Sequence, residues 1–249
     1  MRTALVAGLG LIGGAVGMAL RRAGWRVTYL DPHVSLDEAQ RAAAADGLPD
    51  DSHEVIVLAT PVDVAVELLR TLGSGRAEAR PTLVTSVCSV MGPFVGDGCI
   101  AGHPMAGWHE GGLANAHHVT LDGARWFLSA EHPLVDELVR ACGATPVLVD
   151  PHEHDAAMAV VSHLPQVLST ALFAHLGDQP HVEQFAGAGL RSFRLAASDG
   201  AMWHSVLAAN REHLSPHADA IAELVRAIIE GRDVDAFARA RRLWQSLQR

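Results

Sequence analysis

The chain has 249 residues, of which 49% are hydrophobic and 19% are charged, so a packed core is expected and wholesale disorder is excluded. Its formal net charge is −9, and because that average field repels polyanions we expect no nucleic acid and no membrane as partners. The three cysteines are an odd number without CxxC spacing, which is typical of free thiols in a reducing compartment and favours a cytoplasmic protein.

Short apolar runs alternate with helical patterns through the first 149 residues. The pattern predicts strands at 3–7, 25–30, 54–59, 82–87, 125–128 and 145–149, and helices at 12–22, 62–72 and 133–141. Continuous apolar strands separated by helices are typical of a parallel sheet that is covered on both faces. The sequence therefore predicts an α/β fold with a Rossmann-type, doubly wound parallel sheet.

The pattern changes at Asp150, where a new helix is predicted to begin. Asp150 can cap that helix, Pro151 suits its first position, and Glu153 stands where a capping box places an acid. After this point the sequence predicts helices only, with apolar stripes over 158–172, 221–229 and 237–247. We therefore predict a dinucleotide-binding domain over 1–149 and a smaller all-helical domain over 150–249.

The apolar stripes of the second half are more extensive than one small helical domain can bury on itself, so we expect a homodimer built on these helices. The alternative is a self-contained bundle that packs on the sheet. The first apolar run ends at a glycine after one strand length, so we expect no signal peptide. No apolar run approaches the roughly 20 residues of a membrane-spanning helix, so we expect no membrane span.

A glycine motif, GLGLIG at residues 8–13, follows the first predicted strand and opens a helix. The glycines allow a tight turn and close backbone approach, and the helix N-terminus can then face a pyrophosphate. Asp31 ends the second predicted strand, where a carboxylate binds a ribose 2′-hydroxyl and disfavours a 2′-phosphate, so we expect NAD rather than NADP. The predicted cofactor residues are Gly8, Gly10, Leu11, Ile12, Gly13, Asp31, Thr60 and Pro61. A flavin, another nucleotide or an empty glycine turn remain alternatives.

A single histidine, His103, stands in the rigid segment GHPMAG at residues 102–107. A histidine that titrates near neutral pH is suited to general base catalysis, and next to a dinucleotide site it suggests redox chemistry with a proton to remove. The alternative is a histidine that only completes a turn.

Five sequence blocks, spread over nearly the whole chain, occur in the order that is expected for a known enzyme family. They are GLGLIGG (8–14), VTSVCSV (84–90), GHPMAG (102–107), VSHLP (161–165), and RLAASD (194–199) with Met202 and Trp203. The chain resembles the prephenate/arogenate dehydrogenase family. The resemblance implies NAD-dependent oxidative decarboxylation of a cyclohexadienol, in tyrosine biosynthesis, with prephenate as the substrate and arogenate, or both, as the alternative.

The resemblance also implies roles for individual residues. His103 would take the proton of the ring hydroxyl, and Ser89 would orient the hydroxyl or the imidazole. A guanidinium holds a carboxylate with two hydrogen bonds, and Arg194 matches that role. The other predicted substrate-binding residues are His163, Gln166 and His109. His163 can equally be a satisfied histidine between helices, and Pro165 beside it cannot donate to the carbonyl of Val161, which predicts a kink.

The chain departs from the family pattern at several positions. Many members have an acidic residue where this chain has His109, and many that use prephenate have a second histidine where it has Gln166. Many also have Asp-x-Gly-Ser-x-Lys in the second block, where this chain has Ser86, Cys88, Ser89 and Met91. These departures affect the choice between prephenate and arogenate more than the type of reaction. The chain ends soon after its last predicted helix, so we expect no ACT-type regulatory domain and no fused chorismate mutase.

Three other readings of the sequence compete with this one. A metal site at residues 152–155 or 117–118 lacks the HExxH spacing, so we expect no metal. Dehydrogenases of the 3-hydroxyacid or 6-phosphogluconate type use a lysine base, and this chain contains no lysine. A non-catalytic NAD-binding sensor or scaffold is the remaining alternative, and it predicts NAD binding without turnover.

Overall fold

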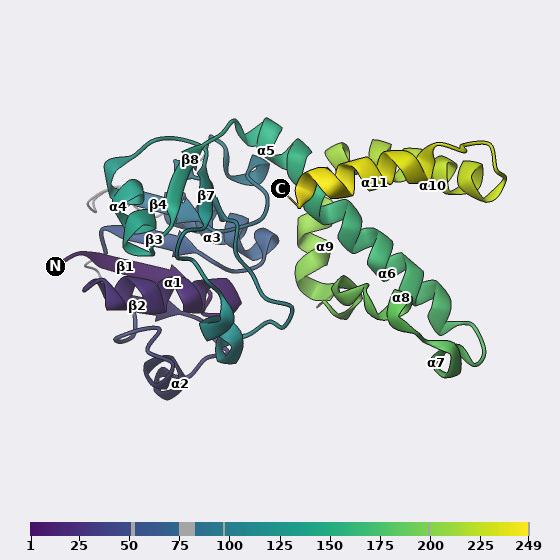
Figure 1. Ribbon diagram of the computed structural model, residues 1–249. Helices are drawn as coiled ribbons and strands as arrows, with labels where there is room; N and C mark the ends of the chain where they lie inside the picture. Colours follow the sequence, from purple (N-terminus) through teal and green to yellow (C-terminus); the bar gives the residue numbers. More distant parts are fainter. Residues whose placement is uncertain (51–52, 75–82, 97, 199, 249) are drawn as a thin grey trace.

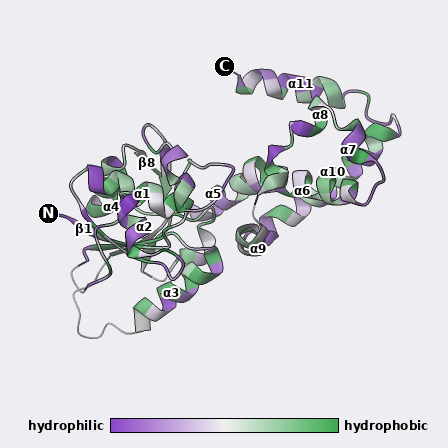
Figure 2. Cartoon of the chain, turned by 90° about the horizontal axis from the view of Figure 1, so that it is seen from below, coloured by the Kyte–Doolittle hydropathy of each residue, from purple (hydrophilic) through white to green (hydrophobic). Residues whose placement is uncertain are grey.

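The computed structural model describes residues 1–50, 53–74, 83–96, 98–198 and 200–248, and it has two lobes (Figure 1). The N-terminal lobe is a sheet structure covered by helices, and the other lobe is made of helices. Figures 1 and 2 both show α5 (Pro151–Met158) as the element that leads from one lobe to the other. The predicted fold class is confirmed. Thr82 and Asp199, which belong to a predicted strand and to the fifth sequence block, lie outside the described residues.

The main sheet has five parallel strands in the order β2-β1-β3-β4-β5. These strands are β1 (Thr3–Ala7), β2 (Arg26–Leu30), β3 (Val55–Leu58), β4 (Leu83–Ser86) and β5 (Cys99–Ile100). Strand order reverses between β1 and β3, and in open α/β sheets ligands bind at the carboxyl ends of the strands beside such a reversal. The glycine motif follows β1 directly, so it lies at that edge.

Both faces of the sheet are covered, as continuous apolar strands require. Val55 and Val57 pack in one core with α1 (Leu11–Arg22) and α4 (Pro133–Ala141). Ile56 and Leu58 pack in a second core with α3 (Val62–Ser74). A further helix, α2 (Leu36–Arg41), was not predicted, although the Ser35 side chain and Glu38 form a capping box at its start.

A second, three-stranded sheet lies beside the first one. Its strands are β6 (Gly102–Pro104), β7 (Arg125–Leu128) and β8 (Thr145–Leu148), and β6 runs antiparallel to β7. The strands β7 and β8 were predicted, but β6 was not, because a three-residue segment of Gly, His and Pro has no strand signature. A Cβ on Gly102 would lie 2.6 Å from the Ser86 carbonyl oxygen, so close packing of β6 on β4 requires glycine.

The remaining elements are short helices in the first lobe and longer ones in the second. In the first lobe, 3-10 turns cover Gly92–Phe94 (η1) and Leu113–His118 (η2). The second lobe contains η3 (Ala159–His163), α6 (Leu164–Gly177), α7 (Val182–Phe185), α8 (Ala188–Arg191), η4 (Arg194–Ala197), α9 (Gly200–Ala209), α10 (Arg211–Ile229) and α11 (Ala236–Leu247). Asp150 caps α5 as predicted, because its carboxylate accepts hydrogen bonds from the backbone N–H groups of His152 and Glu153.

The helix that starts at Pro151 changes its winding before Pro165. Residues Ala159–His163 form a turn of π-helix, in which the Leu164 N–H donates to the carbonyl of Ala159, five residues back. Proline at the second position of α6 has no N–H to offer the preceding turn, so the α-helical ladder cannot run through it. The irregularity predicted near Pro165 therefore takes the form of a widened turn.

One expectation from the sequence is wrong in its literal form. The continuous helical segment Pro151–Gly177 has 27 residues and contains a stretch that is long and apolar enough, by length and composition alone, to cross a bilayer. It nevertheless carries His154, Asp155 and His163 as buried groups, and all three bond to protein partners. Ionisable groups at the bilayer centre are costly, so the expected absence of a membrane span stays a prediction.

Candidate active site

The glycine motif forms a tight turn between β1 and α1. Gly8 has a φ of 92°, and a Cβ there would lie 2.7 Å from the carbonyl carbon of Ala59 at the end of β3. A Cβ on Gly13 would lie 1.9 Å from the Gly8 carbonyl oxygen. At Gly10, in contrast, a Cβ would meet no atom within 4 Å, so this position faces open space. The first and third glycines are thus required for packing, and the second leaves room for a ligand.

The start of α1 and the end of β2 are arranged for a dinucleotide. No side chain caps α1 at Gly10, so the first N–H groups, at Leu11 and Ile12, are available to an anion. The Asp31 carboxylate accepts the N–H of Leu9 at 2.8 Å and the N–H of His33 at 2.8 Å. These bonds fix Asp31 beside the glycine turn, which is the position that a ribose-binding carboxylate needs.

Thr60 and Pro61 connect β3 to α3 at the same edge of the sheet. The Thr60 hydroxyl donates to the Pro61 carbonyl at 3.3 Å, and its methyl group lies near the Gly8 turn. The structure therefore brings the predicted cofactor residues together at one edge of the main sheet, after β1, β2 and β3.

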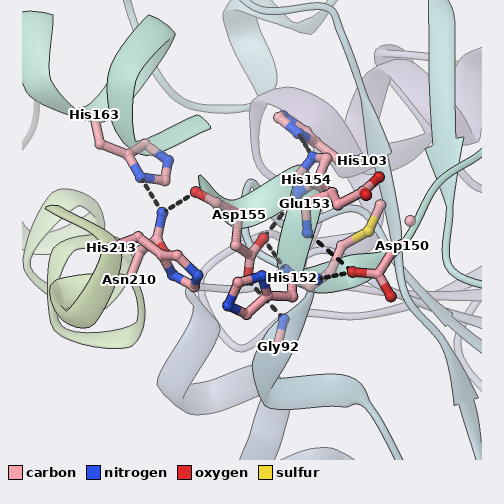
Figure 3. Close-up of polar contacts among 12 residues, drawn as sticks. Gly92, His103, Asp150, His152, Glu153, His154, Asp155, His163, Asn210 and His213 are labelled. Atoms are coloured by element: carbon pink, nitrogen blue, oxygen red, sulfur yellow. Dashed lines mark hydrogen bonds and ion pairs between the residues drawn. The ribbon is translucent and has the colours of Figure 1, made fainter. Parts of the chain in front are cut away.

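His103 lies on β6 and belongs to a chain of three side chains (Figure 3). Its Nδ1 lies 2.9 Å from Nε2 of His154, and Nδ1 of His154 lies 2.8 Å from Oδ1 of Asp155. Asp155 also accepts the N–H groups of Met91 and Gly92, each at 2.8 Å. These contacts join the end of β4 and β6 to α5.

The direction of each bond in this chain follows from the Asp155 carboxylate. Burial raises the pKa of Asp155, but hydrogen bonds from His154, Gly92 and Met91 outweigh it, so the pKa is lowered and the group is ionised at neutral pH. An ionised carboxylate only accepts, so Nδ1 of His154 donates to it, and Nε2 of His154 must accept from Nδ1 of His103. Nε2 of His103 is then left with a free lone pair, which is what a general base requires.

Burial, together with the neighbouring His154 and His163, lowers the pKa of His103 to about 3, although Asp155 opposes the shift. The imidazole is therefore uncharged at neutral pH and able to accept a proton.

The sequence did not identify His154 and Asp155 as site residues. Both lie near the start of a predicted helix, but the run of histidine and acidic residues at 152–155 was considered only as a possible metal site. Among the described residues, no hydrogen bond joins Ser89 to His103, and the ring is oriented by His154 instead. Ser89 lies in the loop after β4, just before the N–H groups that hold Asp155, and its orienting role stays a prediction.

His163 is fully buried, and its Nδ1 lies 3.0 Å from Nδ2 of Asn210. Its ring meets that of Trp203 edge-to-face, with centroids 5.9 Å apart. The sequence left open whether His163 binds substrate or lies satisfied between helices. Within the described part of the chain, its Nε2 has no hydrogen-bond partner, so the ring is only half satisfied.

Gln166 and Arg194 lie on two elements that pack together, α6 and η4. The Gln166 amide donates to the Leu195 carbonyl at 2.8 Å and to the Thr170 hydroxyl at 3.1 Å, and it accepts from Ser198 at 3.2 Å. Arg194 is exposed at the start of η4 and, in the part of the chain that the structure describes, makes no ion pair. Gln166 therefore fastens the segment that carries Arg194, whose role in substrate binding stays a prediction.

His109 lies in the exposed loop between β6 and η2. Its ring lies 4.5 Å from that of Trp108, which stacks on His118 at 4.6 Å. Over the described ranges, three or more potential metal ligands do not cluster anywhere; the absence of a metal stays a prediction.

Comparison with known proteins decides the family. The chain is 30% identical over 269 residues to prephenate dehydrogenase of Bacillus subtilis (strain 168), and the match covers 94% of this chain and 71% of that protein. The chain belongs to the prephenate dehydrogenase family. Residues 150–242 also match the family described as "Prephenate dehydrogenase, dimerization domain". The resemblance predicted from the five sequence blocks is thereby confirmed.

Solved structures of the prephenate dehydrogenase family share this fold. Prephenate dehydrogenase of Aquifex aeolicus, in complex with hydroxyphenyl propionate and NAD+, superposes with a TM-score of 0.81 at 22% identity, over 100% of this chain and 98% of that one. Arogenate dehydrogenase of Synechocystis gives a TM-score of 0.71 at 23% identity, over 99% of this chain and 97% of that one. Both likenesses show the two-lobed architecture and do not distinguish the substrate.

Proposed function

We propose that the chain is an NAD-dependent prephenate dehydrogenase, which oxidises prephenate to 4-hydroxyphenylpyruvate with loss of carbon dioxide. The observation that carries the proposal is the row of contacts from Asp155 through His154 to His103, which leaves the lone pair on Nε2 of His103 free. Membership in the prephenate dehydrogenase family supports it. We also propose a cytoplasmic location, supported by an odd number of cysteines without CxxC spacing.

The proposed chemistry assigns one task to each group. His103 takes the proton of the ring hydroxyl through Nε2, and the Asp155–His154 pair stabilises the resulting imidazolium. NAD, when bound, supplies the acceptor for the hydride, which leaves the ring carbon that bears this hydroxyl. The Arg194 guanidinium holds a substrate carboxylate. The ring carboxylate leaves as carbon dioxide, and the ring becomes aromatic.

The assay that tests this function follows NADH or NADPH formation with prephenate and with arogenate, each with NAD and with NADP. We expect turnover with prephenate and NAD, because Asp31 disfavours a 2′-phosphate. Faster turnover with arogenate would assign the substrate to the alternative within the family. NAD binding without turnover of either compound would favour a sensor or scaffold and would refute the proposed activity.

The proposed pyrophosphate position predicts a loss of cofactor affinity in the variant Gly10→Ala. A Cβ there meets no protein atom within 4 Å, so the fold should tolerate it, but the methyl group would occupy space that the pyrophosphate needs. We expect the Kd for NAD to rise about tenfold or more, or ~1.4 kcal/mol, as measured by calorimetry. Gly177→Ala, at another uncrowded glycine, is the matched control. Unchanged NAD affinity in Gly10→Ala would contradict the position.

We further propose a homodimer built on α10 and α11. These helices leave large apolar side chains exposed, and green hydrophobic segments recur along both in Figure 2. The exposed residues are Ile229 (80%), Phe237 (77%), Leu247 (71%), Trp244 (66%) and Leu243 (63%). Contiguous exposed apolar surface of this kind marks a protein interface, and the match to a dimerization domain supports the same assignment.

The dimer proposal predicts that replacing two of these side chains by charges separates the protomers. Phe237→Glu combined with Trp244→Glu should convert the dimer to a 26.4 kDa species in sedimentation velocity, because each charge would be buried without a partner. Leu48→Glu, at a residue 60% exposed in the other lobe, is the control and should remain dimeric. A parent protein that sediments only as a monomer at micromolar concentration would refute the dimer.

A further inference from the structure

The ring of His163 has one satisfied and one unsatisfied nitrogen. The side chain has no exposed surface, and within the described residues its Nε2 lacks any hydrogen-bond partner. Buried polar atoms in folded proteins are nearly always paired, so an unpaired one needs a reason. In Figure 3 this nitrogen points away from Asn210, toward the side where His154 and His103 lie. Asn210 contacts both His163 and the backbone carbonyl of Asp155, and the Asp155 side chain bonds His154, which contacts His103.

Asn210, at the junction of α9 and α10, fixes which nitrogen of His163 carries the proton. Its Nδ2 lies 2.7 Å from the Asp155 carbonyl oxygen, an acceptor, so the amide nitrogen rather than the amide oxygen must face that carbonyl. The amide oxygen is then free to accept from Nδ1 of His213 at 2.9 Å. The second hydrogen of Nδ2 points to Nδ1 of His163, at 3.0 Å.

Because an amide nitrogen cannot accept, Nδ1 of His163 must be the unprotonated nitrogen. The proton of the neutral ring is therefore on Nε2. Burial is the main cause that lowers the pKa of His163 to about 4; Asp155 opposes this shift and His154 adds to it. The ring is therefore uncharged at neutral pH. The groups that face it come from each neighbouring element: His154 and Asp155 of α5, Trp203 of α9 and Asn210 at the start of α10.

We propose that His163 binds the substrate as an uncharged hydrogen-bond donor, through Nε2–H to an oxygen atom of the ring, and that Asn210 is a positioning residue that sets this tautomer. The proposal rests on the proposed dehydrogenase function, and it adds what the family resemblance left open. An anionic or hydroxyl oxygen of the substrate satisfies the buried N–H group, which no atom of the described residues satisfies. A neutral donor also leaves the lone pair of His103 as the base of the site.

The tautomer is measured by nuclear magnetic resonance on protein labelled with nitrogen-15 in its histidine rings. The chain has 15 histidines, and the spectrum of His163→Gln identifies the His163 signals by their loss. We expect an unprotonated Nδ1 and a protonated Nε2 in the parent. In Asn210→Asp a carboxylate would face Nδ1, so the proton should move to Nδ1. The milder variant Asn210→Ser, whose hydroxyl can either donate to or accept from Nδ1, should give a mixture of the two forms if Asn210→Asp does not fold.

Substrate contact is tested by the steady-state kinetics of two His163 variants, each of which places an amide group near one of the two ring nitrogens. Gln places an amide near the position of Nε2 and Asn places one near Nδ1. We expect His163→Asn to raise KM about tenfold or more, with a smaller effect on kcat, and His163→Gln to stay within a few-fold of the parent. His217→Asn, at an exposed histidine of α10, is the control and should match the parent.

The outcomes separate the two claims. Equal losses in both His163 variants, or better binding by His163→Asn, would show that the ring only anchors Asn210 and would overturn the substrate contact. A protonated Nδ1 in the parent would overturn the role of Asn210. A parent protein that oxidises neither prephenate nor arogenate would refute the proposed function and the substrate contact together, while the spectrum still decides the tautomer.

Discussion

His103→Asn is expected to lower kcat by about two orders of magnitude or more, which is the usual contribution of a general base. The amide nitrogen of Asn lies near the position of Nδ1, so it can still donate to His154 as Nδ1 of His103 does. The substitution therefore removes mainly the Nε2 lone pair that takes the proton. Turnover is followed by NADH absorbance. The Kd for NAD, measured by calorimetry, should change little, because the cofactor residues lie between β1 and the start of α1, just after β2, and in the turn after β3.

The control for His103→Asn is the unfolding midpoint of the variant, which should stay close to that of the parent if the bond to His154 is kept. Near-parental turnover in this variant would remove His103 from the mechanism. A loss of NAD affinity equal to the loss of turnover would show instead that the substitution disturbs the cofactor site.

Asp155→Asn is expected to lower kcat by about two to four orders of magnitude, because the orientation of both imidazoles depends on one carboxylate. Asn has a single acceptor, whereas Asp155 accepts from His154, Met91 and Gly92. A neutral amide also cannot stabilise the imidazolium that forms on His103. One N–H group is left unpaired, so we expect a loss of roughly 1–3 kcal/mol in the free energy of unfolding, measured by urea titration.

Asp150→Asn is the matched control for Asp155→Asn. Asp150 caps the same helix through hydrogen bonds from His152 and Glu153, and Asn caps helices as well as Asp does. This variant should therefore keep the kcat and the stability of the parent. If Asp155→Asn kept parental kcat while it lost stability, the carboxylate would hold the loop after β4 and have no part in proton transfer.

Local sequence signals were sufficient for much of the fold. The glycine turn, the strands that flank it and the start of α5 each carry their own short-range signature, in spacing or in capping residues. The strand β6 carries none, since its pairing is decided by how closely Gly102 approaches Ser86 and Trp126. The capping box of Ser35 and Glu38 was readable in the sequence, and α2 was missed because the helix is short.

The sequence indicated which residue types form the site, but not which of these residues contact each other. His103 and His154 are 51 positions apart, and only the packing of α5 against β6 brings their rings together. The sequence marked Gln166 as a departure from the family pattern, and the structure shows its amide engaged with Leu195 and Ser198. Asn210 had no local signal, because a single asparagine between two helical patterns is typical of an ordinary helix end.

The widened turn at Ala159–His163 carries one surplus residue relative to regular winding. Removing that residue would straighten the helix and improve its backbone bonding, yet everything after the excision would swing by about 100° around the axis. His163 would then leave its place opposite Asn210, and Gln166 would no longer reach the segment of Arg194. Regular α-helical winding and the correct placement of the site residues are thus incompatible in this chain. A variant shortened by one residue should therefore gain thermal stability but lose turnover.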